Sequence, residues 1–265
     1  MPQIYASKTL PMTRLPIAFC SILFAAPLFP QGSETSQPLG GQQAIDLLLE
    51  QDLNYPIAAL EVGLKGDVIV RLHVLSSGTV TAIGVERSLS PECDAEAMRL
   101  MRLVRWRPST SDDERGTADH YLTVTFDPGK YRRWVKARPK RDAAVFGLPA
   151  SDSLAVFAAK QLEQQPAPLI AGGMTGLAKH IGTNMRYPDE AYRRSIEGVV
   201  RLDFVVEASG VVSNMRAIEE LGGGCTAEAT RLLSQIAWTP GVLGGQRVRS
   251  SVQVSIRFTL PEHAR

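Results

Sequence analysis

The sequence lacks the residue patterns on which most catalytic and ligand-binding sites depend. Its 265 residues contain three cysteines and four histidines, with no C-x-x-C pair and no two histidines at metal-ligand spacing. The nucleophile elbow G-x-S-x-G, the zinc motif H-E-x-x-H and a phosphate-binding glycine loop are also missing. We therefore expect a protein that is not an enzyme and that needs no cofactor and no metal.

The sequence also has little net charge and no run of prolines. Its 29 Lys and Arg residues oppose 27 Asp and Glu residues, which gives a net charge of +2 and favours no class of partner. The 17 prolines are scattered, which excludes a long Pro-rich spacer. With 44% apolar and 21% charged residues, the composition is that of a globular protein with room for two domains.

The apolar run near the N-terminus is too short for a comfortable membrane span. It covers residues 15–26, follows Lys8 and Arg14 and contains Pro16, whereas a span needs about 20 apolar residues. This pattern is typical of a secretory signal peptide, so we expect residues 1–26 to be removed and the protein to be periplasmic. The alternative is an uncleaved segment that anchors the protein to the inner membrane. Export excludes nucleic acid as a partner.

Two segments of the chain match at a constant offset. Cys93 and Cys225 are 132 positions apart, as are the tryptophans of the W-x-P motifs that end at Pro108 and Pro240. The match runs without a gap from residue 40 to residue 126 and indicates a tandem duplication of one small domain. We call residues 40–127 the first copy, residues 172–261 the second copy and residues 128–171 the linker.

Each copy has the pattern of an α+β domain. A helix entered from a Gly-Gly pair is followed by a short helix after Tyr-Pro, two strands joined at Ser-Gly, a helix led by the cysteine and a last strand. Val68, Val70, Leu72 and Val74 alternate with residues that are polar except for Ile69, which is typical of a strand with one buried face. We predict two tandem domains, each a small antiparallel three-stranded sheet packed against helices.

The linker is cationic at its start. Its cations are Lys130, Arg132, Arg133, Lys136, Arg138, Lys140 and Arg141, with Tyr131 and Trp134 among them. It is either a solvated, flexible connection or a contact for an anionic envelope polymer, lipid head groups or a partner. Residues 151–164 can form a short helix that begins at a Ser or Asp cap.

The cysteines leave two interpretations open. Cys20 is lost if the leader is removed, so that the repeat-equivalent Cys93 and Cys225 remain, each near the start of a helix. They are either two separate, half-buried small residues or an inter-domain disulfide, which requires Cα atoms within about 7 Å. A disulfide would make a redox sensor conceivable.

The second copy resembles the C-terminal domain of the TonB family. The residues that carry the resemblance are Gly172-Gly173, Tyr187-Pro188, Gly198, Ser209-Gly210, Gly222-Gly223-Gly224-Cys225, Trp238-Thr239-Pro240 and the terminal strand. The GGGC form resembles the Bacteroidetes-type energy-transducer members. The first copy resembles the family more loosely, because residues 89–92 read L-S-P-E where the second copy has its glycines.

The resemblance implies a periplasmic protein-interaction module in TonB-dependent transport. In TonB an edge strand captures an extended peptide of an outer-membrane transporter by strand addition. The matching strand here is residues 249–259, and its partner-binding residues would be Ser251, Gln253, Ser255 and Arg257. Alternatively, these residues are the wet side of a sheet. The implied partner is an envelope protein or a TonB-dependent outer-membrane transporter. Membrane contact is at most peripheral, and an open sheet edge also permits a homodimer.

The chain departs from TonB itself in two respects. No histidine lies in residues 15–26, and the Pro-rich spacer is missing. We therefore expect an exported relative that binds partners without transducing energy. The alternatives are a structural envelope protein and the inter-domain disulfide redox sensor, neither with a role in transport.

Overall fold

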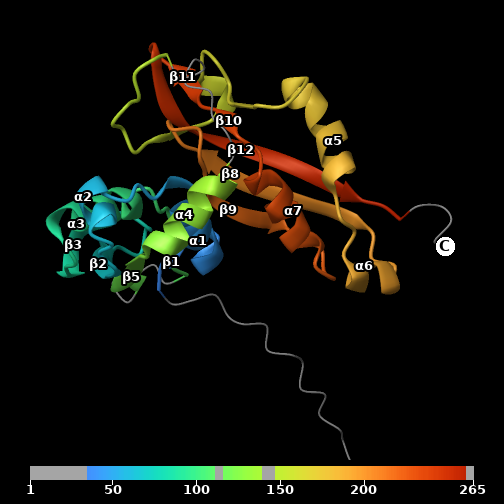
Figure 1. The fold of residues 1–265 in the computed structure, drawn as a ribbon. Helices are drawn as coiled ribbons and strands as arrows, with labels where there is room; N and C mark the ends of the chain where they lie inside the picture. The colour runs from blue at the N-terminus through green and yellow to red at the C-terminus, as the bar shows by residue number, and fades with distance from the viewer. Residues whose placement is uncertain (1–34, 111–115, 139–146, 261–265) are drawn as a thin grey trace, which may run out of the picture. The chain divides into compact units, whose positions relative to one another are not determined.

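The computed structural model describes residues 35–110, 116–138 and 147–260 (Figure 1). These residues all belong to one compact unit of the chain. The predicted signal peptide, residues 1–26, lies outside the described residues. Two copies of an α+β domain follow each other along the chain, as predicted.

The first copy is a three-stranded antiparallel sheet with helices. The short strand β1 (Gln37–Pro38) precedes it, and its own elements are α1 (Gly41–Asp52), α2 (Ile57–Glu61), β2 (Gly66–Val74), β3 (Val80–Arg87), α3 (Pro91–Met101), β4 (Trp106–Arg107) and β5 (Ala118–Phe126). The strand order is β3-β2-β5. A separate two-stranded ladder joins β1 to β4.

The second copy repeats this order and enlarges the sheet. The linker strand β7 (Ala167–Pro168) precedes it, and its own elements are α5 (Gly173–Asn184), α6 (Asp189–Arg193), β8 (Gly198–Val206), β9 (Val212–Glu219), α7 (Cys225–Ser234), β10 (Trp238–Thr239), β11 (Gly241–Leu243) and β12 (Gln246–Phe258). The strands β9, β8 and β12 correspond to the predicted three. The linker strand β6 (Val156–Phe157) and the hairpin strand β11 extend the sheet to five strands.

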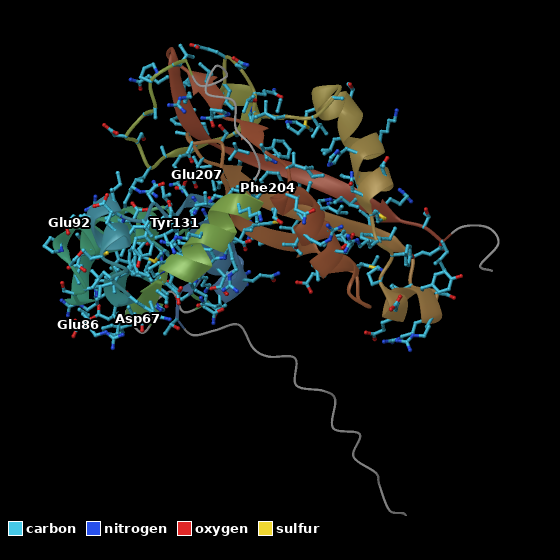
Figure 2. All side chains as sticks on the ribbon, in the orientation of Figure 1. Asp67, Glu86, Glu92, Tyr131, Phe204 and Glu207 are labelled. Atoms are coloured by element: carbon cyan, nitrogen blue, oxygen red, sulfur yellow. The ribbon has the colours of Figure 1, made fainter. Side chains whose placement is uncertain are left out.

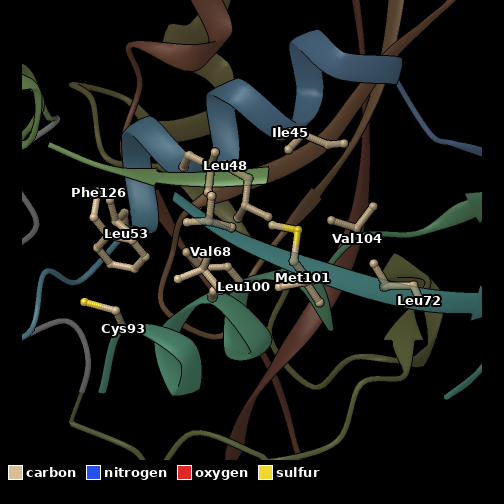
Figure 3. Close-up of a cluster of buried hydrophobic side chains, with 14 of the residues drawn as sticks. Ile45, Leu48, Leu53, Val68, Leu72, Cys93, Leu100, Met101, Val104 and Phe126 are labelled. Atoms are coloured by element: carbon tan, nitrogen blue, oxygen red, sulfur yellow. The ribbon is translucent and has the colours of Figure 1, made fainter. Parts of the chain in front are cut away.

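The alternating apolar residues place one face of each sheet in a core. Val68, Val70, Leu72 and Val74 of β2 are fully buried, and Leu48 of α1 and Leu100 of α3 cover them (Figure 3). The second copy has its own core, in which the rings of Phe204 of β8 and Trp238 pack edge to face with their centroids 5.2 Å apart. Each copy therefore buries its own apolar face, which is what makes the duplicated unit a domain.

The glycine run before α7 is a close-packed turn. Gly224 caps the helix with a φ of 89°, a left-handed conformation that favours glycine. A β-carbon at Gly223 would lie 2.9 Å from the Cα of Ala191 in α6. In the first copy Ser90 caps the equivalent helix α3 by accepting a hydrogen bond from the N–H of Cys93, and Pro91 starts it.

The helix of the linker lies at a different place from the predicted one. Residues 128–137 form α4 (Pro128–Ala137), capped by Asp127, and Tyr131 and Trp134 pack against the first core (Tyr131 is labelled in Figure 2). Residues 151–164 contain only β6 and the 3-10 turn η3 (Ala159–Gln161). The prediction of a helix there was wrong, because the backbone of this segment bonds to strands, as when Glu163 donates to the C=O of Val242.

We predict that Gly223→Ala destabilises the protein more than Gly222→Ala does. The substitution at Gly223 combines a left-handed φ of 66° with a clash against α6, whereas a β-carbon at Gly222 meets no atom within 4 Å. The expected loss for Gly223→Ala is about 1–3 kcal/mol of unfolding free energy, measured by urea denaturation. Equal stability of the two variants would contradict the close-packed turn.

Candidate functional site

Backbone hydrogen bonds at the end of β8 decide which way each residue of β12 faces. In a strand, successive residues direct their N–H and C=O groups to opposite sides. Glu207 donates its N–H to Val211 on the β9 side, so the preceding Val206 faces β12. Because Val206 pairs with Ser250, the even-numbered residues of β12 face β8 and the odd-numbered residues face outward.

The linker covers only the first part of this outer side. The N–H of Arg247 donates to the C=O of Pro149 at 2.8 Å, and the C=O of Arg247 accepts from Ser151 at 2.8 Å. β6 continues this cover, running parallel to β12 with Val156 opposite Arg249. In the described part of the chain, no strand pairs with the outer side of β12 beyond this point. We call residues 251–258 of β12 the open edge.

The predicted partner-binding residues all lie on the open edge. They are Ser251, Gln253, Ser255 and Arg257, and the first is half-buried while the other three are exposed. Their backbone groups face outward and their side chains occupy the polar face of the sheet, because the intervening Val254 and Ile256 are buried in the core. The structure thus brings the four residues together as one row, beside backbone groups that no strand of the described residues pairs with.

A cavity of about 600 Å³ adjoins the start of the open edge. Ser251, Val252 and Gln253 form one side of it. The remaining lining is mixed, with Gln165, Pro166, Met174 and Ile218 beside the ion pair of Arg216 and Asp203 at 3.1 Å. A side chain of a strand added to β12 would enter this cavity just after the end of β6.

The first copy has an equivalent edge on β5. Its strand pairs with β2 along its full length, and among the described residues no strand covers its other side. Residues equivalent to Ser251 and Gln253 are Asp119 and Tyr121, and Tyr121 is 55% exposed. The two edges thus differ in the side chains that flank them.

The opposite edge of the second sheet is covered by the first copy. Gly40, which caps α1, lies so close to β9 that a β-carbon there would clash with the C=O of Met215. Leu47 of α1 packs against the second core. The strand β9 is therefore buried over Val212–Met215, whereas the equivalent start of β3 is exposed.

A bulge in β9 turns Asn214 toward the first copy. The pairing with β8 shifts between Asp203 and Val205, and Asn214 has a φ of 51°. Its Oδ1 accepts from the N–H of Arg105 at 2.7 Å, and its Nδ2 donates to the C=O of Leu103 at 3.0 Å. The amide side chain thus binds the backbone that follows α3.

A buried ion pair supports the same contact. Arg249 of β12 and Glu207 (labelled in Figure 2) are 4% and 2% exposed, and their Nε and Oε2 atoms are 2.7 Å apart. Arg249 also donates to the C=O groups of Leu103 and Leu154, at 2.7 and 2.8 Å. Breaking such a pair leaves an uncompensated buried charge, which costs about 3–5 kcal/mol.

Sequence reasoning missed these three residues. Their counterparts in the first copy are Leu75, Ala82 and Thr117, which carry no charge or amide. The available signal was this departure from the repeat, since positions that differ in chemistry between two copies of one fold mark contacts that only one copy makes.

Cys93 and Cys225 are not brought together. Both are free and fully buried, one in the first core and one in the second. Burial raises the pKa of both thiols, which disfavours the reactive thiolate. Their placement matches the interpretation as separate small core residues and speaks against an inter-domain disulfide.

The described residues offer no metal cluster and no membrane span. No group of three or more potential His, Cys, Asp or Glu ligands occurs within residues 35–110, 116–138 and 147–260. None of the helices in these ranges is long and apolar enough to cross a bilayer.

Comparisons with known proteins identify the repeated unit. The family described as Gram-negative bacterial TonB protein C-terminal matches residues 51–128 and 183–260, more than half of the chain. No curated protein matches the chain. A solution structure of the TonB C-terminal domain of Helicobacter pylori is 22% identical, covering 34% of this chain and 81% of that one, with a TM-score of 0.27. A shorter form of that domain is 19% identical, covering 34% and 95%, with a TM-score of 0.26. Because these TM-scores are low, the family assignment rests on the family match.

We predict that removing the Asn214 side chain loosens the contact between the copies. Asn214→Gly keeps the left-handed φ accessible but loses both hydrogen bonds, whereas Asn214→Ala also adds backbone strain. We expect losses of about 1–3 kcal/mol for the glycine variant and more for the alanine variant in urea denaturation. A glycine variant as stable as the unmodified protein would show that these bonds contribute nothing.

Proposed function

The chain belongs to the TonB C-terminal family, and from this membership we propose that it is an exported, periplasmic binding module. It captures an extended segment of an envelope protein, such as a TonB-dependent outer-membrane transporter, by strand addition to the open edge. The family fits a TonB-like role in TonB-dependent transport. The identity of the captured segment, the compartment and the mode of capture belong to the proposal.

The observation that carries the proposal is the unpaired outer side of β12. Four residues there, Ser251, Gln253, Ser255 and Arg257, each direct one N–H and one C=O outward. A partner strand aligned with them gains a ladder of backbone hydrogen bonds, which supply affinity with little demand on sequence. Solvent pairs these groups when no partner is present.

The linker itself shows that the outer side of β12 can pair with an added strand. β6 is already a short strand added to β12 on the same side, and it runs parallel to β12. Because β6 occupies the positions opposite Arg249 and Ser250, an incoming segment must begin its pairing beyond them. The linker therefore sets the register at which a partner starts.

The cavity at the start of the edge supports selectivity. An added strand places alternate side chains on the two faces of the sheet. One of them would lie over Gln253 and enter the cavity of about 600 Å³ lined by Met174 and Arg216. Apolar and charged groups lie together there, which favours a side chain with an aliphatic stem and a polar end.

The alternatives have less support. Two molecules could pair through their open edges, which would make the protein a structural homodimer, and the test below includes that outcome. The redox sensor would need a disulfide between Cys93 and Cys225, and it has less support because the two thiols are free and buried in separate cores. Binding without energy transduction rests on the sequence, where residues 15–26 hold no histidine and no Pro-rich spacer follows.

We predict that Gln253→Pro weakens capture while leaving the fold intact. Proline removes an outward N–H, and that N–H takes no part in the ladder between β12 and β8. Fluorescence anisotropy with extended peptides of outer-membrane transporters should show at least a roughly tenfold weaker affinity. Gln253→Thr is the matched control, because it changes the side chain and keeps the donor.

Two outcomes would contradict the proposal. Equal affinity of the proline and threonine variants would exclude strand addition at this edge. A shift from dimer to monomer on Gln253→Pro, measured by light scattering and without peptide binding by any form, would assign the edge to self-association.

A further inference from the structure

The linker helix α4 carries a group of cations that the proposed function does not use. They are Lys130, Arg132, Arg133 and Lys136, all exposed. None of the ion pairs among the described residues includes any of the four, and α4 itself holds no carboxylate. A solvated, flexible linker would spread such charges over many conformations, whereas a helix holds them in one arrangement.

Packing of α4 against the first copy fixes the direction in which the cations point. Tyr131 and Trp134 contact the first core, and the guanidinium of Arg138 donates to the C=O groups of Glu50 and Leu53 at the end of α1, each at 2.8 Å. Asp127 caps the first turn by accepting from the N–H groups of Gly129 and Lys130. The helix is thus held at both ends and along one side.

The cations lie on the side opposite to this packing. At about 100° per residue, Tyr131, Trp134 and Arg138 share a narrow arc, and the four cations span roughly 160° centred on the other side of the helix. They lie within about 9 Å along the axis, at 1.5 Å per residue. This is close to the Debye length of about 8 Å at physiological salt, so their fields add. Lys130 is further held over the ring of Trp134, at 4.6 Å.

The shape of this surface selects the class of partner. The four cations line none of five of the best-formed cavities in the described residues. An ordered row of exposed charges on one helix offers little shape for a particular peptide or sugar. A flat surface of laterally mobile anionic head groups needs no such shape, because the lipids can gather under the charges.

From this geometry we infer that α4 is a docking surface for an anionic membrane leaflet. The contact is peripheral and electrostatic, because the aromatic side chains of α4 are committed to the first core and are not free to insert. It is independent of the open edge, since the four cations and β12 belong to different elements. Docking would hold the chain at a membrane surface while β12 stays available to a partner.

The test is cosedimentation of the purified exported chain with vesicles of phosphatidylcholine, with and without phosphatidylglycerol. We expect binding to the anionic vesicles at 0.1 M salt and its loss at 1 M, where the Debye length falls from about 10 Å to about 3 Å. Replacing the four cations of α4 with Gln should lower the partition coefficient by roughly 600-fold, since each basic residue near an anionic surface contributes roughly a fivefold factor. Gln maintains helix propensity, so the fold is retained.

A matched control removes the same net charge elsewhere. It replaces four other exposed cations with Gln, namely Lys160 of the linker and Lys179, Arg186 and Arg193 of the second copy. We expect this variant to bind the anionic vesicles as the unmodified chain does. An equal loss in both variants, no binding to anionic vesicles, or binding to peptidoglycan sacculi in place of vesicles would overturn the inference.

Discussion

One constraint governs this molecule: every backbone N–H and C=O along a strand must be paired or reach water. In the second copy β8 is paired on both sides, α1 covers β9, and the linker bonds to the first residues of β12. Within the described residues, what these covers leave is the outer side of residues 251–258. The position of the open edge is therefore set by the contacts of β8, α1 and the linker with the other strand edges of the second copy.

The duplication explains why the two copies have diverged. The first copy contributes α1 and the loop after α3 to the contact between the copies. The second copy contributes the bulge at Asn214 and the buried pair of Glu207 and Arg249. These polar groups stabilise the contact between the copies because their hydrogen bonds are buried or partly buried. The equivalent start of β3 lacks such a cover and is exposed. The first copy thus covers one edge of the second sheet, whereas within the described residues no strand covers either edge of its own sheet, β3 or β5.

Much of the fold could be predicted because it depends on local patterns. The alternation of Val68, Val70, Leu72 and Val74 gives a half-buried strand, and the constant offset between Cys93 and Cys225 gives the repeat. The confirmed α+β architecture needed nothing else. Residues on the open edge were predicted from the family resemblance, although the direction of their backbone groups required the register with β8.

Other features could not be predicted because they depend on tertiary contacts. The helix α4 was not predicted, because its many cations are typical of a solvated linker. The helical spacing of Tyr131, Trp134 and Arg138 was the available signal. Residues 151–164 were expected to form a helix, but their backbone groups form hydrogen bonds with β11 and β12 instead.

The central claim, that β12 is left open for a partner strand, is tested most directly by residue-resolved amide hydrogen exchange with and without a transporter peptide. The account predicts that the amides of Gln253, Ser255 and Arg257 exchange fast in the free protein and become protected in the complex, while those of Val254 and Ile256 are protected in both. Slow exchange of the odd-numbered amides in the free protein, or no change when the peptide binds, would contradict it.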